Sequence, residues 1–123
     1  MPVRSSNSRV LRWPDEDAVR RAALAWAAEL ARREPTLIRL GYFGSYANGT
    51  WGVGSDLDLV AVVTESSHPF ERRANSWNVE VLPVPTDVLV YTSSEWSALS
   101  SHSARFAATL ERETVWLVDR SND

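Results

Sequence analysis

The stretch that decides the fold covers residues 41–63 and reads GYFGSYANGTWGVGSDLDLVAVV. It ends in a near-continuous apolar run from Leu57 to Val63, which predicts a strand that is buried on both faces. Four of the five glycines of the chain lie from Gly44 to Gly54, and Gly41 comes just before them. Because glycine lets a backbone approach a ligand closely, the loop that precedes the strand is a candidate binding loop.

Two aspartates, Asp56 and Asp58, stand at the beginning of the predicted strand with one residue between them. Side chains that are two apart on a strand share a face, so both carboxylates are expected on the same side. Asp87 occupies a comparable place at the start of another predicted strand, residues 86–91. If the two strands are neighbours, three carboxylates meet at one end of the sheet.

Three close carboxylates need a compensating charge. Two like charges about 4 Å apart repel each other by roughly 4 kcal/mol at an effective dielectric constant near 20. Either one carboxylate is then protonated or a divalent cation is bound. Oxygen ligands with no cysteine or histidine nearby favour Mg²⁺ or Mn²⁺ over Zn²⁺. The pattern therefore predicts metal-dependent phosphoryl or nucleotidyl transfer, with Asp56, Asp58 and Asp87 as the candidate catalytic and metal-binding residues.

A candidate phosphate cradle lies earlier in the same stretch. Gly44 and Ser45 follow the first predicted strand and open a short helical segment that ends near Gly49. Backbone amides and a hydroxyl at the start of a helix attract anions. Ten residues, 46–55, separate Ser45 from Asp56. A loop of this length is able to place a triphosphate between the cradle and the metal-binding pair.

The rest of the chain predicts helices and strands around this centre. A helix is expected from Pro14, with acidic residues in its first turn, until Pro35 stops it. Further strands are expected at 36–43, 79–82 and 115–118, and further helical segments after Ser67, from Ser93 and at 103–112. This order indicates an α+β (α/β two-layer) fold, a mixed β-sheet with helices packed mainly on one face. Residues 1–12 are expected to form a flexible N-terminal arm, and residues 13–120 a single domain.

The composition excludes several classes of function. The 123 residues include no cysteine, which excludes disulfides, thiolate zinc sites and a cysteine nucleophile. All 13 basic residues are arginine, so no mechanism uses a lysine. The net charge of -3 argues against non-specific binding to nucleic acid. No apolar run approaches the roughly 20 residues that span a bilayer, so a cytoplasmic location without a membrane partner is expected.

The spacing of these motifs is similar to that of a known family. The pair Gly44-Ser45, followed after ten residues by Asp56-Leu57-Asp58, resembles the signature of the polymerase-β-type nucleotidyltransferase superfamily. The whole stretch 41–63 resembles the minimal nucleotidyltransferases (MNT domains), and residues 86–96, TDVLVYTSSEW, resemble their third-carboxylate strand. The resemblance therefore implies a nucleotidyltransferase fold.

The resemblance also implies roles for individual residues. Gly44 would let the backbone approach the nucleotide, and Ser45 would contact the terminal phosphates. Asp56 and Asp58 would ligate two Mg²⁺ ions, and Asp87 would complete one of the two metal sites. ATP would be the substrate, with AMP passing to a hydroxyl acceptor as pyrophosphate leaves. Family members often carry a basic residue at the position of Asn48, which would offer the nucleotide a hydrogen bond but no charge.

The acceptor and the partner remain open at this point. Small stand-alone MNT proteins commonly pair with a HEPN-domain protein as antitoxin and toxin, and such antitoxins adenylylate a tyrosine of the partner. A first alternative is an aminoglycoside-like nucleotidyltransferase that modifies a small molecule. A second is a non-catalytic module, an antitoxin or scaffold that binds a nucleotide or a partner. The chain is expected to be a bare catalytic core, and its acceptor specificity is expected to come from a second protein or from another subunit of a homo-oligomer.

Overall fold

The computed structural model describes residues 13–121, so the arm expected over residues 1–12 lies outside the described residues. Within these residues a four-stranded sheet has the strand order β3-β2-β1-β4. Its strands are β1 (Leu37–Phe43), β2 (Leu57–Val63), β3 (Thr86–Thr92) and β4 (Val115–Asp119). β1 pairs antiparallel with both β2 and β4, whereas β2 pairs parallel with β3. The prediction of an α+β fold with a mixed sheet is confirmed.

The longest helix, α2 (Glu16–Arg33), begins after Asp15 and not at Pro14. The carboxylate of Asp15 accepts a hydrogen bond from the amide of Ala18 at 2.8 Å, so this aspartate is the N-cap. Acidic residues in the first turn and arginines in the last turn complement the helix dipole. The capping aspartate therefore sets the start of the helix, and the proline only precedes it.

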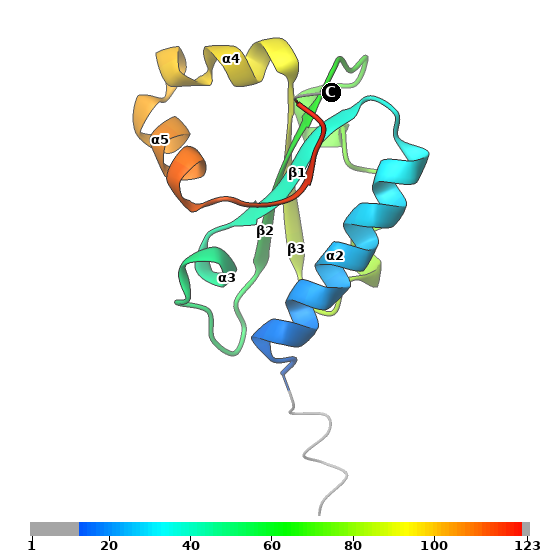
Figure 1. The fold of residues 1–123 in the computed structure, drawn as a ribbon, viewed down its shortest axis with the longest axis vertical. Helices are drawn as coiled ribbons and strands as arrows, with labels where there is room; N and C mark the ends of the chain where they lie inside the picture. Colours follow the sequence, from blue (N-terminus) through cyan, green and yellow to red (C-terminus); the bar gives the residue numbers. More distant parts are fainter. Residues whose placement is uncertain (1–12, 122–123) are drawn as a thin grey trace, which may run out of the picture.

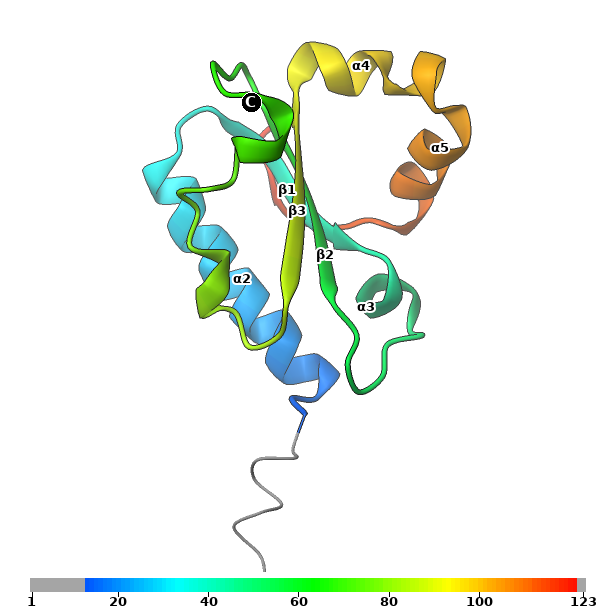
Figure 2. The same ribbon diagram turned by 180° about the vertical axis from the view of Figure 1, so that it is seen from behind.

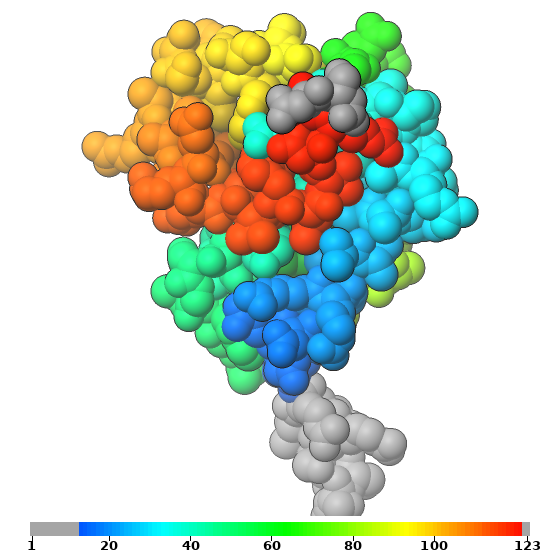
Figure 3. Space-filling view, in the orientation of Figure 1, coloured from blue at the N-terminus to red at the C-terminus, as the bar shows by residue number. Residues whose placement is uncertain are grey.

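Both faces of the sheet are covered by helices (Figures 1 and 2), so the expectation that the helices pack mainly on one face is corrected. The apolar stripe of α2, which includes Ala23, Trp26 and Leu30, joins Leu59 and Ala61 of β2 in the main core. The alternate residues of β2 point to the opposite face and are also buried, as the continuous apolar run predicts. Figures 1 and 2 show α2 on one side of the sheet, with α4 (Ser93–His102) and α5 (Ala104–Glu113) on the other. β4 lies between α5 and α2 at the surface (Figure 3).

One predicted strand is absent from the part of the chain that the structure describes. Residues 79–82 are expected to be extended, yet they form a 3-10 turn, η2 (Val79–Val81). Asn78 enters this turn in the left-handed conformation at φ 58°. Pro83 and Pro85 supply no amide hydrogen for strand pairing. Another 3-10 turn, η1 (Phe70–Arg72), stands where a short helix is expected after Ser67.

The junction between β3 and α4 is stabilised by a capping box. The hydroxyl of Thr92 accepts a hydrogen bond from the amide of Glu95, and the carboxylate of Glu95 accepts one from the amide of Thr92. Arg73 forms an ion pair with the same carboxylate.

None of the helices within residues 13–121 is long and apolar enough to cross a membrane.

Candidate active site

The parallel pairing of β2 and β3 brings two of the predicted site residues side by side. Asp58 lies opposite Asp87 in this register, and both stand at the start of their strands. Asp56 precedes β2 and lies two residues before Asp58. Asp58 is half-buried, whereas Asp56 and Asp87 are exposed. The two strands that carry Asp58 and Asp87 are therefore adjacent, and all three carboxylates belong to the same end of the sheet.

Gly44 lies against the carboxylate of Asp58. Its backbone has a φ of 77°, which residues with a side chain rarely adopt. Gly44 directly follows Phe43, the residue of β1 that pairs with Asp58. A Cβ atom added to Gly44 would lie 2.6 Å from Oδ2 of Asp58. Glycine is therefore required here both by the backbone conformation and by the space that the carboxylate occupies.

The residues that follow Gly44 form one short helix, α3 (Ser45–Asn48). The carbonyl of Ser45 accepts the amides of Gly49 and Thr50, each at 3.1 Å, which closes the turn. Oδ1 of Asn48 accepts the amide of Thr50 at 3.1 Å and its hydroxyl at 2.6 Å. The oxygen of the Asn48 side chain therefore holds the loop, and its NH₂ group is the part that can donate to a ligand.

A stack of aromatic side chains anchors the glycine-rich loop. The ring of Trp51 lies parallel to that of Tyr46, with centroids 5.6 Å apart and an interplanar angle of 10°. Tyr46 is buried, and its hydroxyl accepts a hydrogen bond from Nε1 of Trp13 at 3.2 Å. The stack makes Trp51 an anchor of the loop. The sequence analysis did not identify Tyr46 or Trp13 as anchors of the loop. The one signal that could have indicated such an anchor was the presence of Trp51 within a glycine-rich segment.

The three carboxylates act on one another electrostatically. Burial raises the pKa of Asp58, and the charges of Asp87 and then Asp56 raise it further. Among residues 13–121, no group of three His, Cys, Asp or Glu side chains already stands close enough to hold a metal ion. Uncompensated carboxylates repel one another, which opposes a closer approach. The donor set of hard oxygens at one sheet end fits Mg²⁺, which also takes water and phosphate oxygens as ligands.

A family model described as the nucleotidyltransferase domain matches residues 26–116 of the chain. The chain belongs to this family. The match extends from within α2 to within β4, so Gly44, Ser45 and the three aspartates all lie inside the nucleotidyltransferase domain. The resemblance to nucleotidyltransferases is thereby confirmed. No curated protein sequence matches the chain.

Solved structures show the same fold at low sequence identity. A proposed nucleotidyltransferase from Sulfolobus solfataricus superposes with a TM-score of 0.56 at 18% identity, covering 84% of this chain and 86% of that one. A chain from a toxin–antitoxin structure with AMP-PNP also has a TM-score of 0.56, at 19% identity, covering 89% of this chain and 77% of that one. At this level of sequence identity, the two superpositions show that the nucleotidyltransferase shares its fold with these proteins.

Proposed function

We propose that this nucleotidyltransferase transfers AMP from ATP to a hydroxyl acceptor in a Mg²⁺-dependent reaction. The observation that carries the proposal is the register that sets Asp58 opposite Asp87, with Gly44 against the same carboxylate. This arrangement gives one sheet end a set of oxygen ligands and an adjoining backbone that a phosphate chain can approach. Family membership supports nucleotidyl transfer as the class of reaction.

Each of these residues has a proposed part in the reaction. Asp56, Asp58 and Asp87 would hold the metal, and Asp87 would also help to activate the incoming hydroxyl. Bound Mg²⁺ supplies electrostatic stabilisation to the attacking and leaving oxygens at the α-phosphate. Ser45, following Gly44, contacts the terminal phosphates, and Asn48 donates a hydrogen bond from its NH₂ group.

We further propose that the acceptor is a tyrosine hydroxyl of a HEPN-type partner protein. The toxin–antitoxin structure of similar fold is described as holding AMP-PNP, which supports a pairing of this fold with both a partner and a nucleotide. The glycine-rich loop carries the exposed Val53, at 82% of its full exposure, so it presents an apolar contact to a partner that approaches the site.

Binding of ATP with and without Mg²⁺ tests the first part of the proposal. We expect Mg²⁺-dependent binding by calorimetry, lost in the double variant Asp56→Ala plus Asp58→Ala. The double variant Glu80→Ala plus Glu111→Ala removes the same charge from exposed positions and should bind as the wild type does. Equal binding by both double variants, or none by the wild type, would contradict the metal-dependent site.

Transfer of labelled AMP tests the acceptor. Intact protein, labelled ATP, Mg²⁺ and a HEPN protein encoded beside this chain should give a labelled partner, and a Tyr→Phe change at the modified residue should abolish the label. A label on a small molecule in place of the partner would support the aminoglycoside-like alternative. Absence of label on any acceptor, together with normal ATP binding, would support the non-catalytic module.

A further inference from the structure

A cavity lies near the opposite end of β2 from Asp58. Its volume is about 570 Å³, within the range of sites that hold small molecules. Val63, the last residue of β2, lines it from the face that α2 covers, whereas Asp58 projects from the other face. Val63 lies five residue steps along the extended strand from Asp58, which corresponds to about 16 Å. The cavity is therefore distinct from the candidate active site.

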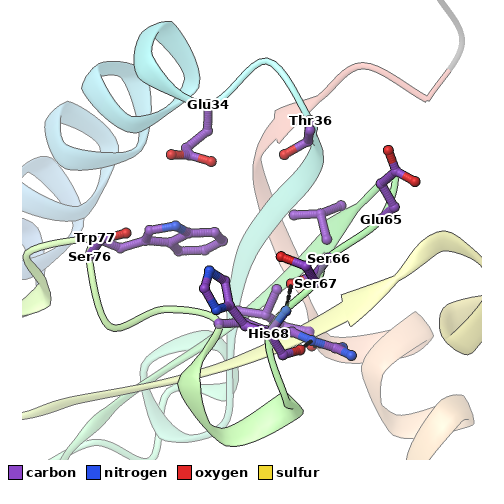
Figure 4. A pocket seen from close by; sticks show the side chains of 11 residues that line it. Glu34, Thr36, Glu65, Ser66, Ser67, His68, Ser76 and Trp77 are labelled. Atoms are coloured by element: carbon purple, nitrogen blue, oxygen red, sulfur yellow. Dashed lines mark hydrogen bonds between the residues drawn. The ribbon is translucent and has the colours of Figure 1, made fainter.

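Side chains from three separate segments surround this space. Figure 4 shows Glu34 and Thr36 from the connection between α2 and β1, Ser66 and His68 from the segment after β2, and Trp77 from the turn before η2. The hydroxyls of Thr36 and Ser66 and the carboxylate of Glu34 are drawn toward the same space as the indole ring (Figure 4). The cavity thus combines an aromatic wall with hydroxyls and an acid.

Glu34 carries a charge that the fold does not compensate. Its carboxylate forms no ion pair with any residue in the described range 13–121. Glu34 is also the C-cap of α2, where the helix dipole already contributes partial negative charge. A carboxylate at this end of a helix is unfavourable for stability, so its position favours a role in attracting a cation.

Trp77 presents a hydrogen-bond donor to the same space. It is 4% exposed, and its carbonyl accepts a hydrogen bond from Nε1 of Trp26 at 2.9 Å. Its own indole N–H donates to none of the residues that the structure describes, although its ring lines the cavity. Among the described residues, this N–H is not one of the fully buried donors that lack a partner, so it is open to the cavity. It can therefore donate to an acceptor oxygen of a ligand.

The one arginine among the lining residues does not neutralise Glu34. Nε of Arg73 donates to the carbonyl of His68 at 3.1 Å, and Nη1 donates to that of Val90 at 3.0 Å. The same guanidinium forms an ion pair with Glu95. Because its charge is committed to Glu95, the cavity keeps the negative charge of Glu34.

We propose that this cavity binds a small hydroxylated amine. The ammonium group would lie at the carboxylate of Glu34, and a hydroxyl oxygen would accept the indole N–H of Trp77. Further hydroxyls would bond to Thr36 and Ser66, and the carbon skeleton would lie along the tryptophan ring. This site is independent of the proposed nucleotidyl transfer, and neither ATP nor a partner protein is required to fill it.

Indole N–H signals in ¹H–¹⁵N spectra of the full chain test the site directly. Glucosamine is the probe, and glucose is the matched neutral molecule. The Trp77 signal is assigned as the one that is missing in Trp77→Phe. We expect glucosamine to shift this signal saturably, with a dissociation constant of about 1 mM, as for a ligand of this size. The signal of Trp51 in the glycine-rich loop should not move.

Two variants with the same loss of charge make the test specific. Glu34→Gln should weaken glucosamine binding about tenfold, because a hydrogen bond to a charged group is lost. Glu65→Gln is the control, since Glu65 also lines the cavity but its carboxylate points away from the space (Figure 4). Glucose should bind about tenfold more weakly than glucosamine. The proposal is overturned by an unmoved Trp77 signal, by equal binding of glucose, or by equal weakening in both variants.

Discussion

Asp58 and Asp87 lie opposite each other in adjacent parallel strands, and each is the second residue of its strand. Burial and the charges of Asp87 and Asp56 raise the pKa of Asp58. A raised carboxyl pKa means that the folded protein favours the protonated acid. The contribution of Asp58 to the free energy of unfolding is therefore greatest at low pH and declines as pH rises through the raised pKa. A bound cation is expected to offset this loss at neutral pH.

Replacement of Asp58 by asparagine separates its catalytic role from its structural cost. Asp58→Asn keeps the shape of the side chain and removes its charge, so the metal-free protein should be no less stable than the wild type. Transfer of AMP should fall by about 100-fold or more. Mg²⁺ should raise the melting temperature of the wild type and leave that of the variant unchanged. Equal Mg²⁺ effects on both proteins would place the metal elsewhere.

Gly44→Ala should disturb the site through its contact with Asp58. The added Cβ meets Oδ2 of Asp58 at 2.6 Å, and the residue keeps a φ of 77°. We expect a loss of about 1–3 kcal/mol in the free energy of unfolding, measured in urea, together with reduced transfer. Gly49→Ala has a similar φ of 84° but no atom within 4 Å, so it isolates the backbone strain. A similar loss in both variants would mean that the contact with Asp58 contributes nothing.

The stack of Trp51 on Tyr46 should determine how firmly the loop is held before Asp56. Trp51→Ala removes the stack and should cost about 0.5–1.5 kcal/mol of stability beyond the lost apolar burial. It should also weaken Mg²⁺-dependent ATP binding, because the loop positions the first aspartate. Trp51→Phe retains a ring and should restore most of the binding, as measured by calorimetry. Normal binding by Trp51→Ala would restrict the role of the stack to stability.

The ion pair of Glu95 with Arg73 predicts a pH dependence of stability. Hydrogen bonds from Arg73 and the Thr92 amide lower the pKa of Glu95 to about 2. A lowered carboxyl pKa stabilises the folded state above the ordinary glutamate value and loses that effect as pH falls toward 2. The difference in unfolding free energy between the wild type and Glu95→Gln should therefore be constant near neutral pH and shrink from about pH 5 downward. A difference that does not change with pH would show that the carboxylate charge is irrelevant.

The sequence predicted β2 to the residue, because seven consecutive residues from Leu57 to Val63 contain only one polar side chain and a strand buried on two faces needs such a run. The number of residues between Ser45 and Asp56 was likewise known from the sequence, since the spacing of a motif is a property of the chain. The end of α2 was predicted closely because Pro35 cannot continue a helix that precedes it. These features depend on local chemistry alone.

The features that the sequence did not predict depend on contacts between distant segments. No local pattern near Val79 shows that Asn78 turns left-handed there, and the apolar residues alone suggested a strand. The contact of Gly44 with Asp58 arises from the pairing of β1 with β2, and the partner of Trp51 became visible only in three dimensions. Glu34 has no ion-pair partner among residues 13–121, and its place at the cavity follows from where the helix and the sheet position it.

The helix α4 is held to the protein differently from α2. None of its ten described residues is buried, although α2 places five residues in the core. Its attachment therefore depends on the capping box of Thr92 with Glu95, on the ion pair with Arg73, and on partly covered rings such as Trp96. A segment with so little burial opens without global unfolding, so its amides should exchange hydrogen for deuterium long before those of β2. The face of the sheet that carries Asp58 is thus bordered by a segment that opens more readily than the strands themselves.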